Sequence, residues 1–124
     1  MNKNQSDGEL IRRTEDYLKS YTFNRRLAEL EKYEREYFED EMSEWEREAP
    51  SDIPLALARM FEIRHFVMDM ENSDEKLFLY YRYIKDESVE RCAELLNISR
   101  SSAYRMRERA LRMARERYIA FFGF

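Results

Sequence analysis

The sequence predicts an all-α protein. Only 2 glycines and 2 prolines occur in 124 residues, which leaves little of the turn-forming material that a sheet protein needs. The good helix formers Glu, Arg, Leu, Met and Ala dominate long stretches. Apolar residues recur three and four positions apart, as they do on one face of an α-helix. We therefore expect helices along most of the chain.

The N-terminal half is predicted to contain a polar tail and two helices. Residues 1–8 are polar and are expected to form the tail. A short helix is expected over 9–21, an interruption at Thr22 or Asn24, and a long helix over 23–48. The long helix carries an apolar stripe, formed by Phe23, Leu27, Leu30, Tyr33, Tyr37, Phe38, Met42 and Trp45. The helical spacing of the stripe favours packing in the core or in a homodimer over stacking on nucleic-acid bases. A stripe that so small a domain cannot bury is a candidate for self-association.

A proline-bounded linker separates the long helix from the rest of the chain. Both prolines lie in the segment 49–54, and Ser51 or Asp52 can cap the helix that follows. That helix is expected over 55–70, where apolar residues occupy more than one face, so we predict that it is well buried. A short aromatic helix over 75–84 follows a turn that Ser73 or Asp74 caps.

The segment from Ser88 to Arg117 has the layout of a helix-turn-helix. Ser88 can cap a helix that runs to Leu96, Asn97-Ile-Ser99 forms a tight break, and Ser99 caps a second helix. The expected inner face has a small residue at the crossing point, a plug in the turn and apolar residues on the second helix: Ala93, Ile98, Ala103, Met106, Ala110 and Met113. The fold class is therefore all-α, with N-terminal long helices followed by a C-terminal helix-turn-helix.

The second of these helices is basic in an acidic chain. Residues 98–124 hold 7 Arg against 2 Glu, whereas the formal net charge of the whole chain is -4. A charge run is usually only a solvated face, but joined to the helix-turn-helix pattern it favours binding to double-stranded DNA. Side chains near the start of a recognition helix reach base edges, and more distal arginines, here 109 to 117, are expected to contact phosphates or solvent. The predicted DNA-binding residues are Arg100, Ser101, Ser102, Tyr104, Arg105 and Arg109.

Three stretches, 78–84 (FLYYRYI), 88–105 (SVERCAELLNISRSSAYR) and 109–111 (RAL), together resemble region four of sigma-seventy-type factors. They are similar in particular to phage and prophage regulators of the ArpU/RinA kind, which activate late genes in Gram-positive hosts. The resemblance implies a helical N-terminal half, RNA polymerase as a partner, and DNA-facing side chains at Arg100, Ser101, Ser102, Tyr104 and Arg105. The chain departs from the family pattern at Ala103, where a β-branched residue is usual, and at Arg107, where Leu is common.

Enzymatic, metal and membrane functions are not expected. His65 is the only histidine and lies in an apolar helix pattern, which excludes a His-based metal cluster or catalytic triad. Cys92 is the only cysteine and is predicted to be buried and inert. We expect no cofactor, and no catalytic or metal-ligating residues. The chain shows no signal peptide and no membrane-spanning run, so we expect it in the cytoplasm of a bacterial host cell.

These observations divide the chain into four segments: the tail 1–8, a helical scaffold 9–72 with possible dimerisation, a DNA-binding domain 73–118 and an apolar tail 119–124. The apolar tail either packs against the helices or docks a partner. The expected function is sequence-specific DNA binding by a phage or prophage transcriptional regulator. The alternative is a protein-interaction adaptor that keeps the sigma-like fold and binds RNA polymerase or another protein without reading DNA.

Overall fold

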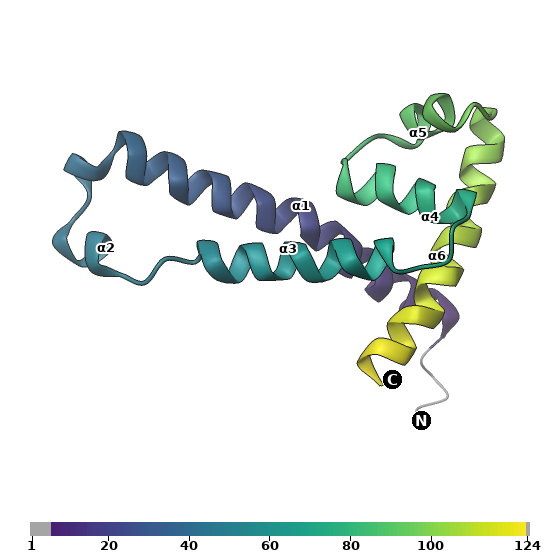
Figure 1. Ribbon diagram of the computed structural model, residues 1–124, viewed down its shortest axis with the longest axis horizontal. Coiled ribbons are helices and arrows are strands. Elements are labelled where there is room, and N and C mark those ends of the chain that lie inside the picture. Colours follow the sequence, from purple (N-terminus) through teal and green to yellow (C-terminus); the bar gives the residue numbers. More distant parts are fainter. Residues whose placement is uncertain (1–5, 124) are drawn as a thin grey trace.

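A computed structural model describes residues 6–123, which form helices and no strand, so the all-α prediction is confirmed (Figure 1). Residues 1–5 of the expected tail and Phe124 lie outside the described residues. The elements in chain order are α1 (Asp7–Tyr37), the 3-10 helix η1 (Glu39–Glu41), α2 (Glu44–Glu48), α3 (Ile53–Met68), α4 (Asp74–Leu79), the π-helix η2 (Tyr80–Ile84), α5 (Val89–Leu96) and α6 (Arg100–Phe122).

Helix α1 is continuous, so the interruption expected at Thr22 or Asn24 is wrong. Both residues are buried within the helix. The amide of Asn24 donates a hydrogen bond to the carbonyl oxygen of Ser20, one turn earlier, at 2.7 Å. Asn and Thr are unfavourable in helix interiors because their side chains compete for the hydrogen bonds of backbone groups. A hydrogen bond to a carbonyl oxygen of the preceding turn is nevertheless compatible with a helix.

The long helix expected over 23–48 instead ends at Tyr37. Phe38 leaves the helical conformation with φ -126° and ψ 17°, and the short elements η1 and α2 follow. Ser43 starts α2, because its hydroxyl accepts a hydrogen bond from the backbone N–H of Glu46 at 3.1 Å. The chain therefore reverses direction here, and α3 returns alongside α1 (Figure 1).

Helix α3 is buried on one face only, so the prediction of burial on several faces is wrong. Its inner residues Ala56, Ile63, Phe66 and Val67 are at most 1% exposed. Its outer apolar side chains remain in solvent: Leu55, Leu57, Phe61 and Met68. The outer parts of α1 and α3, with η1 and α2 between them, project from the cluster of α4, α5 and α6 (Figure 1). We call this segment, residues 23–61, the arm.

One hydrophobic core joins the two halves of the chain. It takes residues from every major helix except α2. The largest fully buried side chains are Tyr83, Phe66, Phe78, Leu18, Ile63, Leu79 and Leu111. Because Leu18 of α1 and Phe66 of α3 lie in the same cluster as the helix-turn-helix residues, the N-terminal helices directly support the C-terminal ones.

Helix α6 extends to Phe122, beyond the end expected near Arg117, so most of the segment expected as a tail is helical. Its last turns contact α1 at Tyr17. Phe122 and Tyr118 contact the ring of Tyr17 with centroids 5.2 and 5.6 Å apart. Phe121 meets Phe66 edge to face at 6.0 Å. These contacts are worth about 1 kcal/mol each beyond burial, and they fix the direction of α6.

Candidate nucleic-acid interface

The turn between α5 and α6 is built by a left-handed residue. Asn97 has φ 56° and ψ 48°, a conformation that Asn tolerates better than most residues. The backbone N–H of Ile98 donates to the carbonyl of Ala93 at 2.9 Å, and that of Asn97 to the carbonyl of Glu94 at 3.1 Å. This pair of bonds is a Schellman motif, which ends α5 and turns the chain sharply into α6.

Serine hydroxyls begin both helices of the helix-turn-helix, as the sequence predicts. The Ser88 hydroxyl accepts from the backbone N–H of Arg91 at 3.0 Å, at the start of α5. The Ser99 hydroxyl accepts from the backbone N–H of Ser102 at 3.1 Å, at the start of α6. Each cap satisfies one of the free N–H groups at a helix start and contributes about 1 kcal/mol.

The predicted inner face is confirmed. Ala93 and Ala103 are 5% and 0% exposed, so α5 and α6 approach closely without a large side chain between them. Met106 and Ala110 continue this buried face along α6. Ile98 in the turn and Met113 further along α6 are half-buried against the core. The register of α6 is therefore the one that the sequence indicates, and it fixes which side chains face outward.

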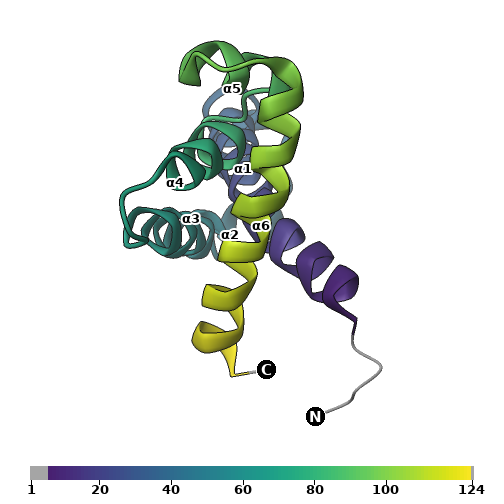
Figure 2. The same cartoon turned by 90° about the vertical axis from the view of Figure 1, so that its right-hand side faces the viewer.

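The predicted DNA-binding side chains lie on the outer face of α6. Ser102 is half-buried. The other five are exposed: Arg100, Ser101, Tyr104, Arg105 and Arg109. The start of α6 and all of α5 lie at one end of the molecule, at the top of Figure 2, and the start of α1 and the end of α6 lie near the other end. The structure thus brings these residues together on one face of α6.

Glu90 of α5 is a counter-charge on this surface. Its carboxylate accepts from Tyr104 at 2.9 Å and pairs with Arg100 at 3.0 Å. Hydrogen bonds from its own backbone N–H and from Tyr104, with the charge of Arg100, hold the pKa of the Glu90 carboxyl below its ordinary value. The side chain therefore stays ionised, and it draws Arg100 and Tyr104 toward α5.

Most arginines of α6 are engaged within the protein. Carboxylate partners hold four of them, and Arg117 donates to the carbonyl oxygen of Phe66 at 2.8 Å and lies over its ring. The four ion pairs are Arg100–Glu90, Arg107–Glu15, Arg109–Glu75 and Arg115–Asp7. The expectation that residues 109 to 117 meet only phosphates or solvent is therefore wrong for Arg115 and Arg117, which are half-buried.

Two arginines of α6 remain available to an external anion. Arg105 is exposed and donates only to the neighbouring hydroxyl of Ser102, at 3.1 Å. Arg112 is exposed and makes no hydrogen bond or ion pair with the described residues. Most of the positive charge of α6 is thus neutralised within the protein. Arg105 and Arg112 are the two arginines of this helix that have no carboxylate partner among the described residues and remain exposed.

A polar network that sequence reasoning missed ties α6 to the N-terminal half. The carboxylate of Glu15 on α1 accepts from the buried hydroxyl of Tyr83 at 2.5 Å and from Arg107 at 2.7 Å. Burial acts to raise the pKa of Glu15, but the Tyr83 hydrogen bond and the charges of Arg107 and Lys19 outweigh it, so this pKa is lowered.

Cys92 and His65 lie in surroundings that are typical of residues with a structural role. Cys92 is fully buried, and burial raises the pKa of its thiol to about 11. The ring of His65 is half-buried and packs on Phe61, with centroids 4.0 Å apart. Within residues 6–123, no three His, Cys, Asp or Glu side chains converge on a point that could hold a metal ion. None of the described helices combines the length and the apolar character that a membrane crossing requires.

The chain is thus an all-α protein with a helix-turn-helix in its C-terminal half, which packs on the N-terminal helices. The chain belongs to the DUF1492 family, described as proteins of unknown function, whose model matches residues 43–115. The match runs from the tip of the arm through the helix-turn-helix and into α6. No curated protein and no solved structure matches the chain.

Proposed function

We propose that the chain is a sequence-specific DNA-binding regulator of transcription. The observation that carries the proposal is the helix-turn-helix itself: a Schellman turn at Asn97, small buried residues where the helices cross, and exposed hydroxyl and arginine side chains at the start of α6. This is the layout with which a recognition helix enters the major groove. The role is binding and not catalysis.

In the proposed complex, the first turns of α6 lie in the major groove. Ser101 and Arg105 project from the exposed face and would meet base edges, and Arg112 lies two turns further along, where it would meet a phosphate. Arg100 and Tyr104 would leave Glu90 for DNA, at small cost because both side chains are exposed. The acidic remainder of the chain would keep other faces away from the duplex.

The biological setting of the proposal rests on the sigma-region-four resemblance. A phage or prophage late-gene activator would recruit RNA polymerase through a surface other than α6. The arm offers such a surface, because it stands away from the helix-turn-helix and carries exposed apolar side chains (Figure 1).

The test is a selection of bound duplexes from a random pool, followed by a titration of the selected duplex at several salt concentrations. Replacing Arg105 by Ala should weaken binding about 5- to 150-fold, since an arginine at a base edge contributes about 1–3 kcal/mol. Arg64→Ala, at an exposed position of α3, is the matched control for charge and should bind as the wild type does. Equal affinity of both variants at two salt concentrations would refute the assignment.

The exposed apolar surface of the arm supports a second candidate function. Its exposed apolar side chains include Phe23, Leu30, Tyr33, Tyr37, Trp45, Leu57 and Phe61, of which Trp45 is 78% exposed. At its tip, a groove of about 420 Å³ combines apolar walls with the carboxylates of Glu34, Glu41 and Glu46. Such a surface suits a protein partner with basic and apolar side chains.

This adaptor function would bind RNA polymerase or another protein without reading DNA. The discriminating observation is whether the purified chain shifts any duplex at moderate salt. Sedimentation of the same sample reports whether two copies pair through the arm, which would raise the effective concentration of a second helix-turn-helix at DNA. Absence of any shift, with a polymerase complex formed through the arm, would favour the adaptor over the regulator.

A further inference from the structure

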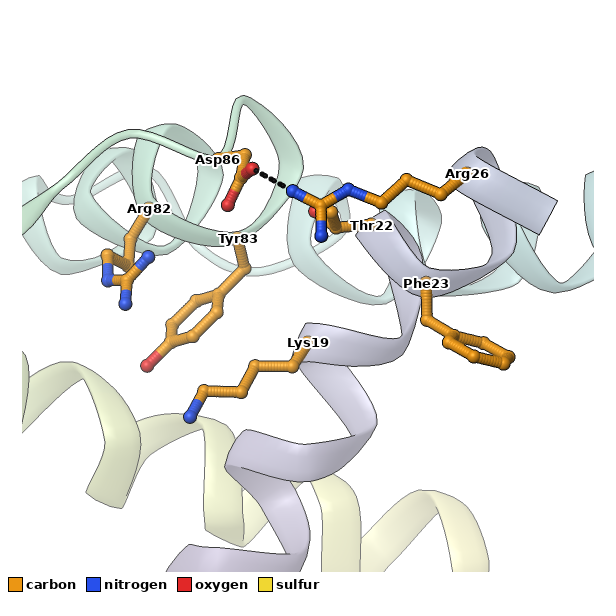
Figure 3. A pocket seen from close by; sticks show the side chains of 7 residues that line it. All are labelled: Lys19, Thr22, Phe23, Arg26, Arg82, Tyr83 and Asp86. Carbon is orange, nitrogen blue, oxygen red and sulfur yellow. Dashed lines mark hydrogen bonds and ion pairs between the residues drawn. The ribbon is translucent and has the colours of Figure 1, made fainter. Parts of the chain in front are cut away.

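A small cavity opens between α1 and the π-helix η2, away from the outer face of α6 (Figure 3). Its volume is about 280 Å³, close to the lower end of the range for small-molecule sites, about 300–1,000 Å³. The lining residues are Lys19, Thr22, Phe23, Arg26, Arg82, Tyr83 and Asp86. The lining thus includes three cationic side chains and one carboxylate; Arg26 pairs with Asp86, and Tyr83 lies between Arg82 and Lys19 (Figure 3).

Arg82 is the fixed cation of this cavity. Its guanidinium is half-buried, donates to the carbonyl oxygen of Glu87 at 3.2 Å and lies over the ring of Tyr83 at 5.4 Å. No carboxylate among the described residues pairs with it, and its Nε is buried without a hydrogen-bond partner. A partly desolvated charge without a counter-ion is unfavourable, so an external anion would stabilise this arrangement.

The other two cations are held only loosely. Lys19 pairs with Glu15 at 3.8 Å, and Arg26 with Asp86 at 3.5 Å, and both basic side chains are more than half exposed. Exposed pairs of this length contribute little, so either cation can turn to a ligand. Glu15 would keep its other two partners, Tyr83 and Arg107, if Lys19 moved.

The backbone at this site is irregular. In η2 the N–H of Lys85 donates to the carbonyl of Tyr80, five residues earlier, at 3.0 Å. Single π turns are rare and occur frequently at functional sites. Asp86, directly after the π turn, has φ 57°. This irregular segment supplies three of the seven lining residues, including Arg82.

We propose that this cavity binds a small molecule through one oxyanion group, a phosphate or a carboxylate. The fork of Arg82 would hold two oxygens, with Lys19 and Arg26 completing the charge balance. Asp86 would repel a second anionic group, and Tyr83 would contact the apolar part of the ligand. The site does not depend on DNA binding by α6.

The test uses the full-length protein and inorganic phosphate as the probe, with sodium chloride at matched ionic strength as the reference. Phosphate at ten times its Kd should raise the Tm of the wild type by about 5 °C. Arg82→Gln should abolish the rise, and Arg82→Lys should reduce it because the charge remains and the fork is lost. Arg64→Gln removes the same charge elsewhere and should leave the rise unchanged.

Circular dichroism without phosphate establishes that each variant is folded, and acetate replaces phosphate in a second titration to compare the two oxyanions. An equal rise in Arg82→Gln and the wild type, or no rise with either phosphate or acetate beyond that in chloride, would overturn the proposal. A duplex DNA titration forms the third arm. Weaker DNA binding by Arg82→Gln, with no response to free phosphate, would assign the cavity to a backbone phosphate and would equally overturn a small-molecule site.

Discussion

The ion pair between Arg107 and Glu15 is predicted to stabilise the fold and not to bind DNA. The two side chains meet at 2.7 Å, with 34% and 14% of their surfaces exposed. A hydrogen bond between charged groups contributes about 1.5–3 kcal/mol, and solvent screening of the arginine reduces this to about 1–2 kcal/mol. With an unfolding entropy of about 2.1 cal/mol/K per residue, Arg107→Met should lower the Tm by about 4–8 °C.

Arg112→Met is the matched control, because it removes the same charge from the same helix at an exposed position without a partner. Surface changes of this kind stay within about 0.5 kcal/mol, which corresponds to less than about 2 °C. Calorimetry of both variants, with Glu15→Gln to close a double-mutant cycle, measures the pair directly. Equal Tm values for Arg107→Met and Arg112→Met, or a coupling energy near zero, would refute the reasoning.

Two further predictions concern the turn and the pH dependence of stability. Asn97→Val should lower the free energy of unfolding by about 1–2 kcal/mol, because a β-branched residue is strained at φ 56°. Glycine adopts this conformation without strain, so the free energy of unfolding of Asn97→Gly, measured by urea titration, should stay within about 0.5 kcal/mol of the wild-type value. The lowered pKa of Glu15 means that its stabilisation is present above the ordinary value of 4.5 and is lost as the pH falls through the folded pKa. The Tm of Glu15→Gln should therefore change less than that of the wild type on acidification below pH 4.5, and parallel curves would contradict this.

Local features of the C-terminal half could be predicted from the sequence because short-range chemistry determines them. Ser88 and Ser99 precede apolar-periodic segments, and each indeed caps a helix. Asn97 follows the last periodic residue of α5, where a left-handed residue is expected. The inward placement of Ala93 and Ala103 follows from the same spacing. Caps, turn and periodicity all agree here, so one arrangement is strongly specified.

The partners of the α6 arginines could not be predicted because they come from distant parts of the chain. Arg107 and Arg115 meet α1 residues about a hundred positions earlier, and Arg117 meets α3. A sequence pattern shows which face a residue occupies but not which helix packs against that face. The same limit applies to the apolar stripe of the arm, whose spacing is equally compatible with a core and with an interface.

The neutralised arginines bear on how strongly one copy could hold DNA. If Arg105 lay at base edges and Arg100 and Arg112 alone met phosphates, the slope of log K against log salt would be about -2, well below that of a large dimeric repressor. Such a small electrostatic contribution favours either extensive base contacts or a second copy. Two copies joined through their arms would double the slope to about -4, because each brings the same two side chains. The salt titration of the proposed regulator therefore reports the number of copies on DNA as well as the number of contacts. A slope near -4 from a chain that sediments as a monomer would mean that the internal ion pairs of α6 open on DNA.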